Sequence, residues 1–150
     1  MGVVMFYHLT ASNAEDTART LLARSVQAGW RVMVRGTDPA SLTALDEALW
    51  HGPEDAFLPH GIAGGAHDAR QPILLGTGPI GTDMQALMAV DGATVDPAEA
   101  DGLERVFILF DGRDDAAVSA ARGQWKALTA AGLAAQYWSE ESGSWEKKAG

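Results

Sequence analysis

Two cations and an indole ring lie close together near the end of the chain. Arg122 and Lys126 are four residues apart, so on a helix they are neighbours on one face, with Trp125 beside them. A guanidinium can hold a carboxylate through two parallel hydrogen bonds, and an indole adds an apolar surface. This combination suits a short peptide that carries carboxylates and an apolar side chain. The same spacing also fits an ordinary amphipathic helix whose basic residues are solvated.

A second group of aromatic residues follows the predicted helix that ends at Trp50. Phe57, Pro59 and His60 come next, in a segment without helical or strand periodicity. In the core, Trp50 and Phe57 would hold this segment against the helix; at the surface they would form an apolar patch for a partner. Spacing leaves both interpretations open. We expect His60 to be a turn residue that hydrogen-bonds the loop or contributes to an interface.

One glycine-rich segment matches a nucleotide-binding pattern. Residues 76–81 read Gly-Thr-Gly-Pro-Ile-Gly and follow a predicted strand, as in the dinucleotide fingerprint G-x-G-x-x-G. That mechanism needs the glycines to open a long helix whose N-terminus receives the pyrophosphate. Pro79 interrupts the motif, and only a short segment precedes the next apolar run. We therefore predict a turn between two strands and no bound cofactor.

The other polar residues give weak support for catalysis or metal binding. Four histidines show no helical pairing and no cysteine supports them, so we expect no metal site at His8, His51, His60 and His67 with Asp68. No Gly-x-Ser-x-Gly nucleophile motif occurs. The carboxylates within 96–101 and 111–115 are predicted to be solvated caps and loops. No catalytic residue is assigned.

The elements that must position these residues alternate between strand and helix. Strands are predicted at 3–8, 30–34, 72–75, 86–90, 104–110 and 134–138, and helices at 12–29, 38–50 and 114–131. This order favours an α/β fold, a three-layer domain with a mainly parallel sheet and right-handed crossovers. Residues 51–71 are predicted to be a long ordered loop, which is commonly functional.

Composition limits the function classes. The 150 residues fit one domain, 1–150, and a net charge of −9 opposes direct binding to duplex DNA, because the eleven basic residues are spread along the chain. No apolar run approaches the roughly 18–20 residues of a membrane span. The N-terminus reads as a strand, and the chain has no cysteine. We expect a soluble cytoplasmic protein.

Several motifs together resemble the chi subunit of the bacterial DNA polymerase III holoenzyme. They are Phe6-Tyr7, Leu45-Asp46-Glu47-Ala48-Leu49-Trp50, Phe57-Leu58-Pro59-His60, Ile62-Ala63-Gly64, Ala121-Arg122-x-x-Trp125-Lys126 and the Ala131-Gly132 exit. They occur in a consistent order over nearly the whole chain. The segment that ends at Trp50, with the Phe-x-Pro-His that follows it, is the most specific part; the helix motif by itself is weak.

The resemblance implies a non-catalytic, clamp-loader-associated accessory protein with a Rossmann-like fold that lacks a functional nucleotide site. Chi proteins bind the acidic, Phe-terminated tail of single-stranded DNA-binding protein, and in many bacteria the psi subunit as well. Carried over by position, the tail site would comprise Arg122, Trp125 and Lys126. The psi-facing patch would comprise Trp50, Phe57, Pro59 and His60.

The chain departs from the family pattern at two positions. Val118 stands where some members have a basic residue one turn before the arginine, and Trp125 stands where the motif has tyrosine. The first departure implies weaker tail binding, and the second keeps a stacking surface but changes its polar group. The alternative hypothesis is a small nucleotide-binding α/β enzyme that uses the Gly76–Gly81 turn.

Overall fold

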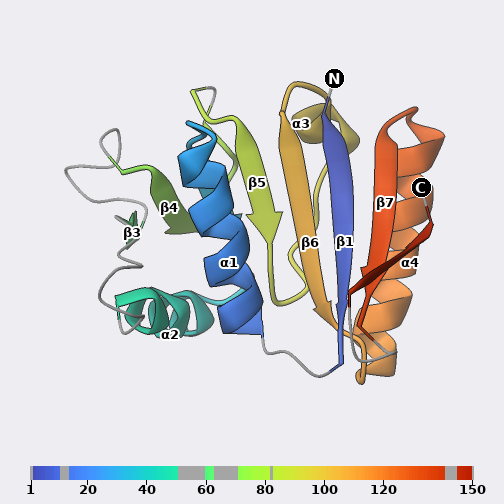
Figure 1. The fold of residues 1–150 in the computed structure, drawn as a ribbon, viewed down its shortest axis with the longest axis horizontal. Helices are drawn as coiled ribbons and strands as arrows, with labels where there is room; N and C mark the ends of the chain where they lie inside the picture. Colours follow the sequence, from blue (N-terminus) through green and yellow to red (C-terminus); the bar gives the residue numbers. More distant parts are fainter. Residues whose placement is uncertain are drawn as a thin grey trace.

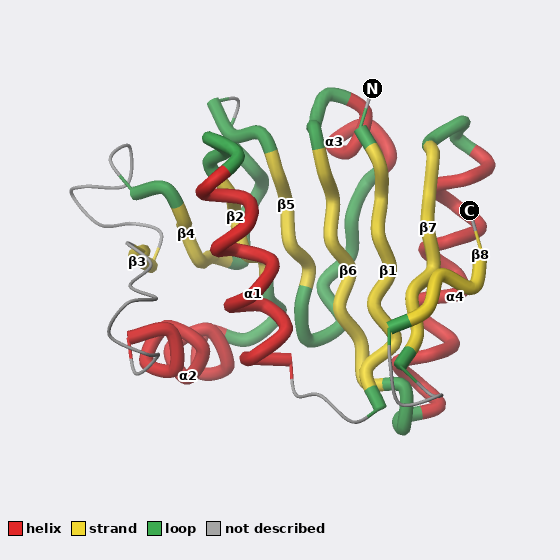
Figure 2. Tube along the Cα trace, viewed as in Figure 1, coloured by secondary structure: helices red, strands yellow, loops and turns green. Residues whose placement is uncertain are grey.

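The structure is a computed structural model. It describes residues 2–10, 14–50, 60–62, 71–81, 83–140 and 145–149, and for Trp50 it describes the backbone alone. The strands are β1 (Val3–Leu9), β2 (Val32–Arg35), β3 (His60–Ile62), β4 (Ile73–Gly76), β5 (Ala86–Ala89), β6 (Arg105–Asp111), β7 (Ala134–Ser139) and β8 (Glu146–Ala149). The helices are α1 (Ala14–Gln27), α2 (Pro39–Trp50), α3 (Pro97–Asp101) and α4 (Asp115–Ala130). Figures 1 and 2 show their arrangement.

The strands form one sheet in the order β3-β4-β2-β5-β6-β1-β7-β8. Every neighbouring pair is parallel except β7 and β8, which are antiparallel. Parallel strands need crossover connections, which the alternation of helix and strand supplies. The predicted α/β fold with a mainly parallel sheet is confirmed.

Helices cover both faces of this sheet, and the side chains of β1 show why. Tyr7 and Leu9 pack in one apolar cluster with residues of α1 and α2, whereas Val4 and Phe6 pack in the other with residues of α3 and α4. Successive side chains of a strand point to opposite faces, so a strand that is apolar throughout supplies both cores. The molecule therefore has three layers, as predicted.

Helix α4 has clear limits at both ends. The Asp114 side chain accepts a hydrogen bond from the backbone N–H of Ala116, and Ala131 is the C-cap. Gly132 follows with a φ of 88°, the left-handed conformation that glycine adopts without a Cβ penalty. The predicted helix over 114–131 is confirmed, with its two end residues as caps. Arg122, Trp125 and Lys126 thus lie well inside a regular helix.

Three short elements were not predicted. β3 lies inside the expected loop 51–71, and its three residues gain strand geometry by pairing with β4. α3 lies where solvated caps and loops were expected, although Asp96 and Glu99 form a capping box around Pro97. β8 has four exposed residues and no apolar alternation. Its strand geometry therefore comes from its pairing with β7, and its composition does not predict it.

Candidate partner-binding sites

The two candidate cations on α4 are exposed and neighbours on one helix face. Arg122 and Lys126 both lie on the solvent side of the helix. In the described part of the chain, neither forms an ion pair or a side-chain hydrogen bond. Within the described residues no carboxylate neutralises their charges, so both are available to an anionic partner.

Trp125 has a different role, because its ring is half-buried between α4 and the sheet. The ring makes edge contacts with Phe6 at a centroid distance of 5.3 Å and with Tyr137 at 6.1 Å. Phe6 comes from β1 and is fully buried, and Tyr137 comes from β7. Aromatic pairs in this geometry stabilise by about 0.5–1.5 kcal/mol beyond area burial. Trp125 thus fixes the helix on the sheet and leaves only part of its ring to solvent.

Aromatic rings beneath Trp125 form a closely packed platform. The Tyr137 hydroxyl lies 2.7 Å from Nδ1 of His8, and the Phe110 ring packs against both side chains. Gly112 covers the His8 ring so closely that a Cβ there would lie 1.9 Å from the His8 Cδ2 atom. This packing holds the base of the candidate site in one geometry.

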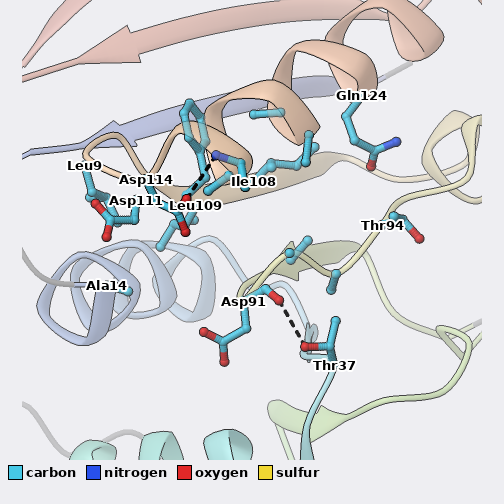
Figure 3. Close-up of a pocket in the computed structure, with 18 of the residues that line it drawn as sticks. Leu9, Ala14, Thr37, Asp91, Thr94, Ile108, Leu109, Asp111, Asp114 and Gln124 are labelled. Atoms are coloured by element: carbon cyan, nitrogen blue, oxygen red, sulfur yellow. Dashed lines mark hydrogen bonds between the residues drawn. The ribbon is translucent and has the colours of Figure 1, made fainter.

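The larger of two described hollows lies elsewhere. It has a volume of about 790 Å³ and lies at the carboxyl ends of β1, β5 and β6, where α4 begins (Figure 3). Arg122, Trp125 and Lys126 do not line it, and they do not line the second described groove. A peptide on the α4 face would therefore lie on the helix surface and not in either of these hollows.

The walls of this cavity carry mainly negative charge. Its lining includes four carboxylates and a single guanidinium: Asp38, Asp91, Asp111, Asp114 and Arg113. Arg113 already pairs with Asp111, with Nε 3.2 Å from Oδ1. Hydrogen bonds from the Arg113 backbone N–H and side chain lower the pKa of Asp111 below its ordinary value. These charges oppose the binding of a phosphate group.

The glycine-rich segment does not open a helix. β4 ends at Gly76, and the next regular element is β5, so the predicted turn between two strands is confirmed. Arg35 holds this turn, because its Nε donates a 3.1 Å hydrogen bond to the Gly78 carbonyl oxygen. The helix N-terminus on which the dinucleotide mechanism depends is absent from the described residues here. The alternative hypothesis of a nucleotide enzyme loses its main support.

Arg35 also corrects one prediction. Glu99, expected to be solvated, is half-buried and accepts two hydrogen bonds from the Arg35 guanidinium, at 2.9 and 2.5 Å. The hydrogen bonds from Arg35 lower the pKa of Glu99, although burial acts in the opposite direction. This carboxylate is a structural partner, because α3 brings it against the end of β2.

The residues expected at the second patch divide into three groups. Phe57 and Pro59 lie outside the described residues, and for Trp50 the structure describes only the backbone, at the end of α2. His60 lies in β3 and not in a turn, and its side chain is 0% exposed. Its Nε2 lies 3.0 Å from the Asp46 carbonyl oxygen and 3.2 Å from Oδ1 of that residue. His60 therefore joins β3 to α2, and its ring is not available for partner contact.

Ile62 is a surface residue of this region that the sequence indicated only as part of a motif and that was not predicted to be a site residue. It ends β3 with 43% of its surface exposed, one of two large apolar side chains so exposed in the described ranges. The Ile62-Ala63-Gly64 motif drew attention to this position. The exposure of Ile62, however, depends on β3 being the edge strand of the sheet, which the sequence does not show.

The described parts of the two candidate regions, β3 and α4, lie toward opposite ends of the sheet. β3 is one edge of the sheet, whereas α4 packs on β6 and β7 near the other edge (Figure 1).

Across the described residues, no helix combines the length and apolarity needed to cross a bilayer.

No curated protein matches the chain. The model of the family described as DNA polymerase III chi subunit, HolC, matches residues 1–136. That match includes β1 to β6, all four helices and the start of β7. The chain therefore belongs to the family of DNA polymerase III chi subunits, which are accessory subunits in DNA replication.

Proposed function

We propose that this protein is an adaptor that binds the acidic, Phe-terminated tail of single-stranded DNA-binding protein and links it to the clamp-loader assembly. The observation that carries the proposal is a pair of exposed cations on α4, Arg122 and Lys126, which have no ion pair within the described residues and lie beside the half-buried ring of Trp125. The chain has a net charge of −9, so this pair is a local positive region that attracts an acidic peptide.

The chemistry follows from these three side chains. The Arg122 guanidinium holds the terminal carboxylate through two parallel hydrogen bonds, and Lys126 meets a neighbouring acidic side chain. The terminal Phe ring packs on the exposed part of the Trp125 indole, whose other part is fixed by Phe6 and Tyr137. Because the indole is held before binding, little side-chain entropy is lost there. Tethering raises the local concentration of the two assemblies without direct DNA contact.

Two features set the strength of this contact. The charges are exposed, so added salt screens them and weakens binding. One turn before Arg122 the helix carries Val118, which is half-buried and packs toward the sheet, so no third cation extends the site. We therefore expect modest affinity that falls steadily as salt concentration rises.

The second surface is proposed to bind a psi-like subunit or another polymerase III component. Exposed Ile62 at the sheet edge supports an apolar contact there. Trp50, Phe57 and Pro59 are proposed to join this contact because the family resemblance assigns them to it. His60 acts as a positioning residue, because its buried ring holds β3 against α2 through Asp46. The adaptor function needs both surfaces, since the first binds the tail and the second holds the assembly.

Titration of a fluorescently labelled tail peptide tests the first site. Arg122→Ala should weaken binding by roughly 1–3 kcal/mol, because charge-assisted hydrogen bonds are lost from an otherwise unchanged helix. The matched control is Arg113→Ala, which removes another exposed guanidinium outside the site, with a side chain that is 72% exposed. Equal affinities for all three proteins would exclude Arg122 from the site, and an effect confined to Arg113→Ala would move the site toward the start of α4.

A further inference from the structure

A second groove lies on the opposite face of the sheet from α4. It has a volume of about 380 Å³, and its lining includes Met5, Tyr7, Asp16, Arg24, Trp138 and Trp145. Its walls are α1 on one side and Trp138 of β7 with Trp145, just before β8, on the other, and β1 forms its floor. In Figure 1, α1 and α2 lie over the other half of the sheet, so no described helix covers β7 on this face.

Aromatic side chains form the apolar part of this groove. The Trp145 ring makes an edge contact with Tyr7 at a centroid distance of 5.4 Å, yet 36% of Trp145 remains exposed. Trp138 is half-buried and oriented by a 3.0 Å hydrogen bond from its Nε1 to Oε1 of Gln136. An exposed indole that lines a hollow offers an apolar contact to a partner. The hollow is large enough for one aromatic side chain.

Two basic side chains at this groove, Arg24 and Lys147, have no ion pair within the described residues. Arg24 lines the groove. Asp16 is the one carboxylate of the lining, and it pairs with Arg19 at 3.2 Å. Lys147 is the register partner of Trp138 in the antiparallel pair, so it lies on the same face of the sheet.

Arg105 adds a third basic group next to the floor. Its Nη1 lies 3.0 Å from the Met5 sulfur, its guanidinium lies 5.5 Å from the Trp30 ring centre, and its buried Nε has no hydrogen-bond partner in the described structure. Burial raises the pKa of Tyr7, while the charges of Arg105 and Arg24 lower it to a smaller extent. The Tyr7 hydroxyl therefore stays protonated at neutral pH and can donate a hydrogen bond.

We propose that this groove is a second peptide-binding site, which takes an acidic segment with one aromatic side chain. The aromatic ring enters between Trp138 and Trp145, and the flanking carboxylates meet Arg24 and Lys147. The site is independent of the proposed tail contact, because none of its residues lies on α4. Trp138 and Trp145 also lie beyond residues 1–136, so the family match does not imply this groove.

Charge favours a peptide over single-stranded nucleic acid. Aromatic rings beside cations can stack bases, but a nucleic acid also needs a continuous basic track for its phosphates. Such a track is interrupted here by acidic groups. Asp16 lies at the rim, Glu146 forms an ion pair with Lys148, and the whole chain has a net charge of −9. A short peptide with two to four carboxylates fits the local cations without meeting the acidic surface around them.

The test uses a labelled peptide, fluorescein-Gly-Asp-Glu-Phe-Asp-Glu-Gly amide, titrated onto the full chain. The amide removes the terminal carboxylate that the α4 site requires, so the two sites are separated. Arg24→Gln and Trp145→Ala should each weaken binding about tenfold, the effect of one charge-assisted hydrogen bond or one buried ring. Arg122→Ala should leave it unchanged. Control ligands are the same peptide with Lys for each acid, the peptide with Ala for Phe, and a labelled oligothymidylate of fifteen nucleotides.

Each outcome of this titration either supports or overturns the proposal. Loss on both groove variants with selectivity for the acidic, Phe-containing peptide supports the proposal. Absence of binding to the unmodified protein, equal binding by Arg24→Gln, or tighter binding of the oligothymidylate would overturn it. Arg24 is an exposed residue of α1, so its substitution leaves the fold intact and the test does not depend on Trp145→Ala retaining β8. Unchanged thermal unfolding midpoints of the variants serve as the folding control.

Discussion

Arg35 and Arg122 carry the same guanidinium in two opposite environments. Arg35 is buried at the end of β2 and donates to both carboxylate oxygens of Glu99, to Gly78 and to Thr94. Arg122 is exposed in the middle of α4 and has no ionic partner in the described structure. A buried charge must be paired, whereas an exposed one can remain unpaired at little cost. The comparison separates arginines that hold the fold from arginines that are available to partners.

The largest effect is expected when the buried member is removed. Arg35→Ala should lower the free energy of unfolding by about 3 kcal/mol, because Glu99 and two carbonyl oxygens lose their donor in a poorly solvated site. Arg122→Ala should change it by less than about 0.5 kcal/mol, since it is a surface substitution. Urea unfolding of both variants followed by circular dichroism measures the difference. A loss below about 1 kcal/mol for Arg35→Ala would show that water replaces the lost contacts.

The contrast also marks what sequence patterns can and cannot predict. The limits of α4 were predicted from Asp114 and Gly132, because a cap and a left-handed exit are local features. The exposure of Arg122 and Lys126 followed from helical periodicity in the same way. By contrast, the pairing of Arg35 with Glu99 joins residues 64 positions apart, and only the tertiary fold brings them together.

The same limit explains the regions that were missed. β3 and β8 are short strands that depend on a neighbour for their geometry, and neither has the apolar alternation of an independent strand. His60 was expected at a turn or interface but is buried, because the pairing of β3 with β4 places it against α2. The groove beside Trp145 was missed because Tyr7 and Trp145 meet only after β8 pairs with β7.

A smaller effect is expected from pH. The folded-state pKa of Glu99 is lowered from its ordinary value of 4.5, mainly by hydrogen bonds from Arg35, so the pair stabilises the fold fully above that value. The contribution is lost as pH falls through the lowered folded-state pKa, since protonation removes the acceptor charge. Unfolding free energies measured from pH 7 to pH 3 should fall more steeply for the unmodified protein than for Glu99→Gln. Asp111, whose pKa is also lowered, contributes equally to both curves and cancels in the comparison.

Parallel curves for the two proteins over this range would contradict the assignment. They would mean that the Arg35 contact does not favour the ionised form of Glu99, and that the acid sensitivity of the fold arises elsewhere.

The smallest effect should come from Gly123, next to Arg122 on α4. A Cβ built at this position meets no atom within 4 Å, so Gly123→Ala should stabilise the helix by about 0.5–1 kcal/mol. On the helical wheel, residue 123 lies beyond Lys126 and away from Trp125, outside the surface proposed for the tail. Tail-peptide affinity should therefore remain unchanged while the thermal unfolding midpoint rises. A gain in stability accompanied by loss of affinity would show that the peptide crosses the helix on the other side of Lys126, and would move the contact away from the Trp125 ring.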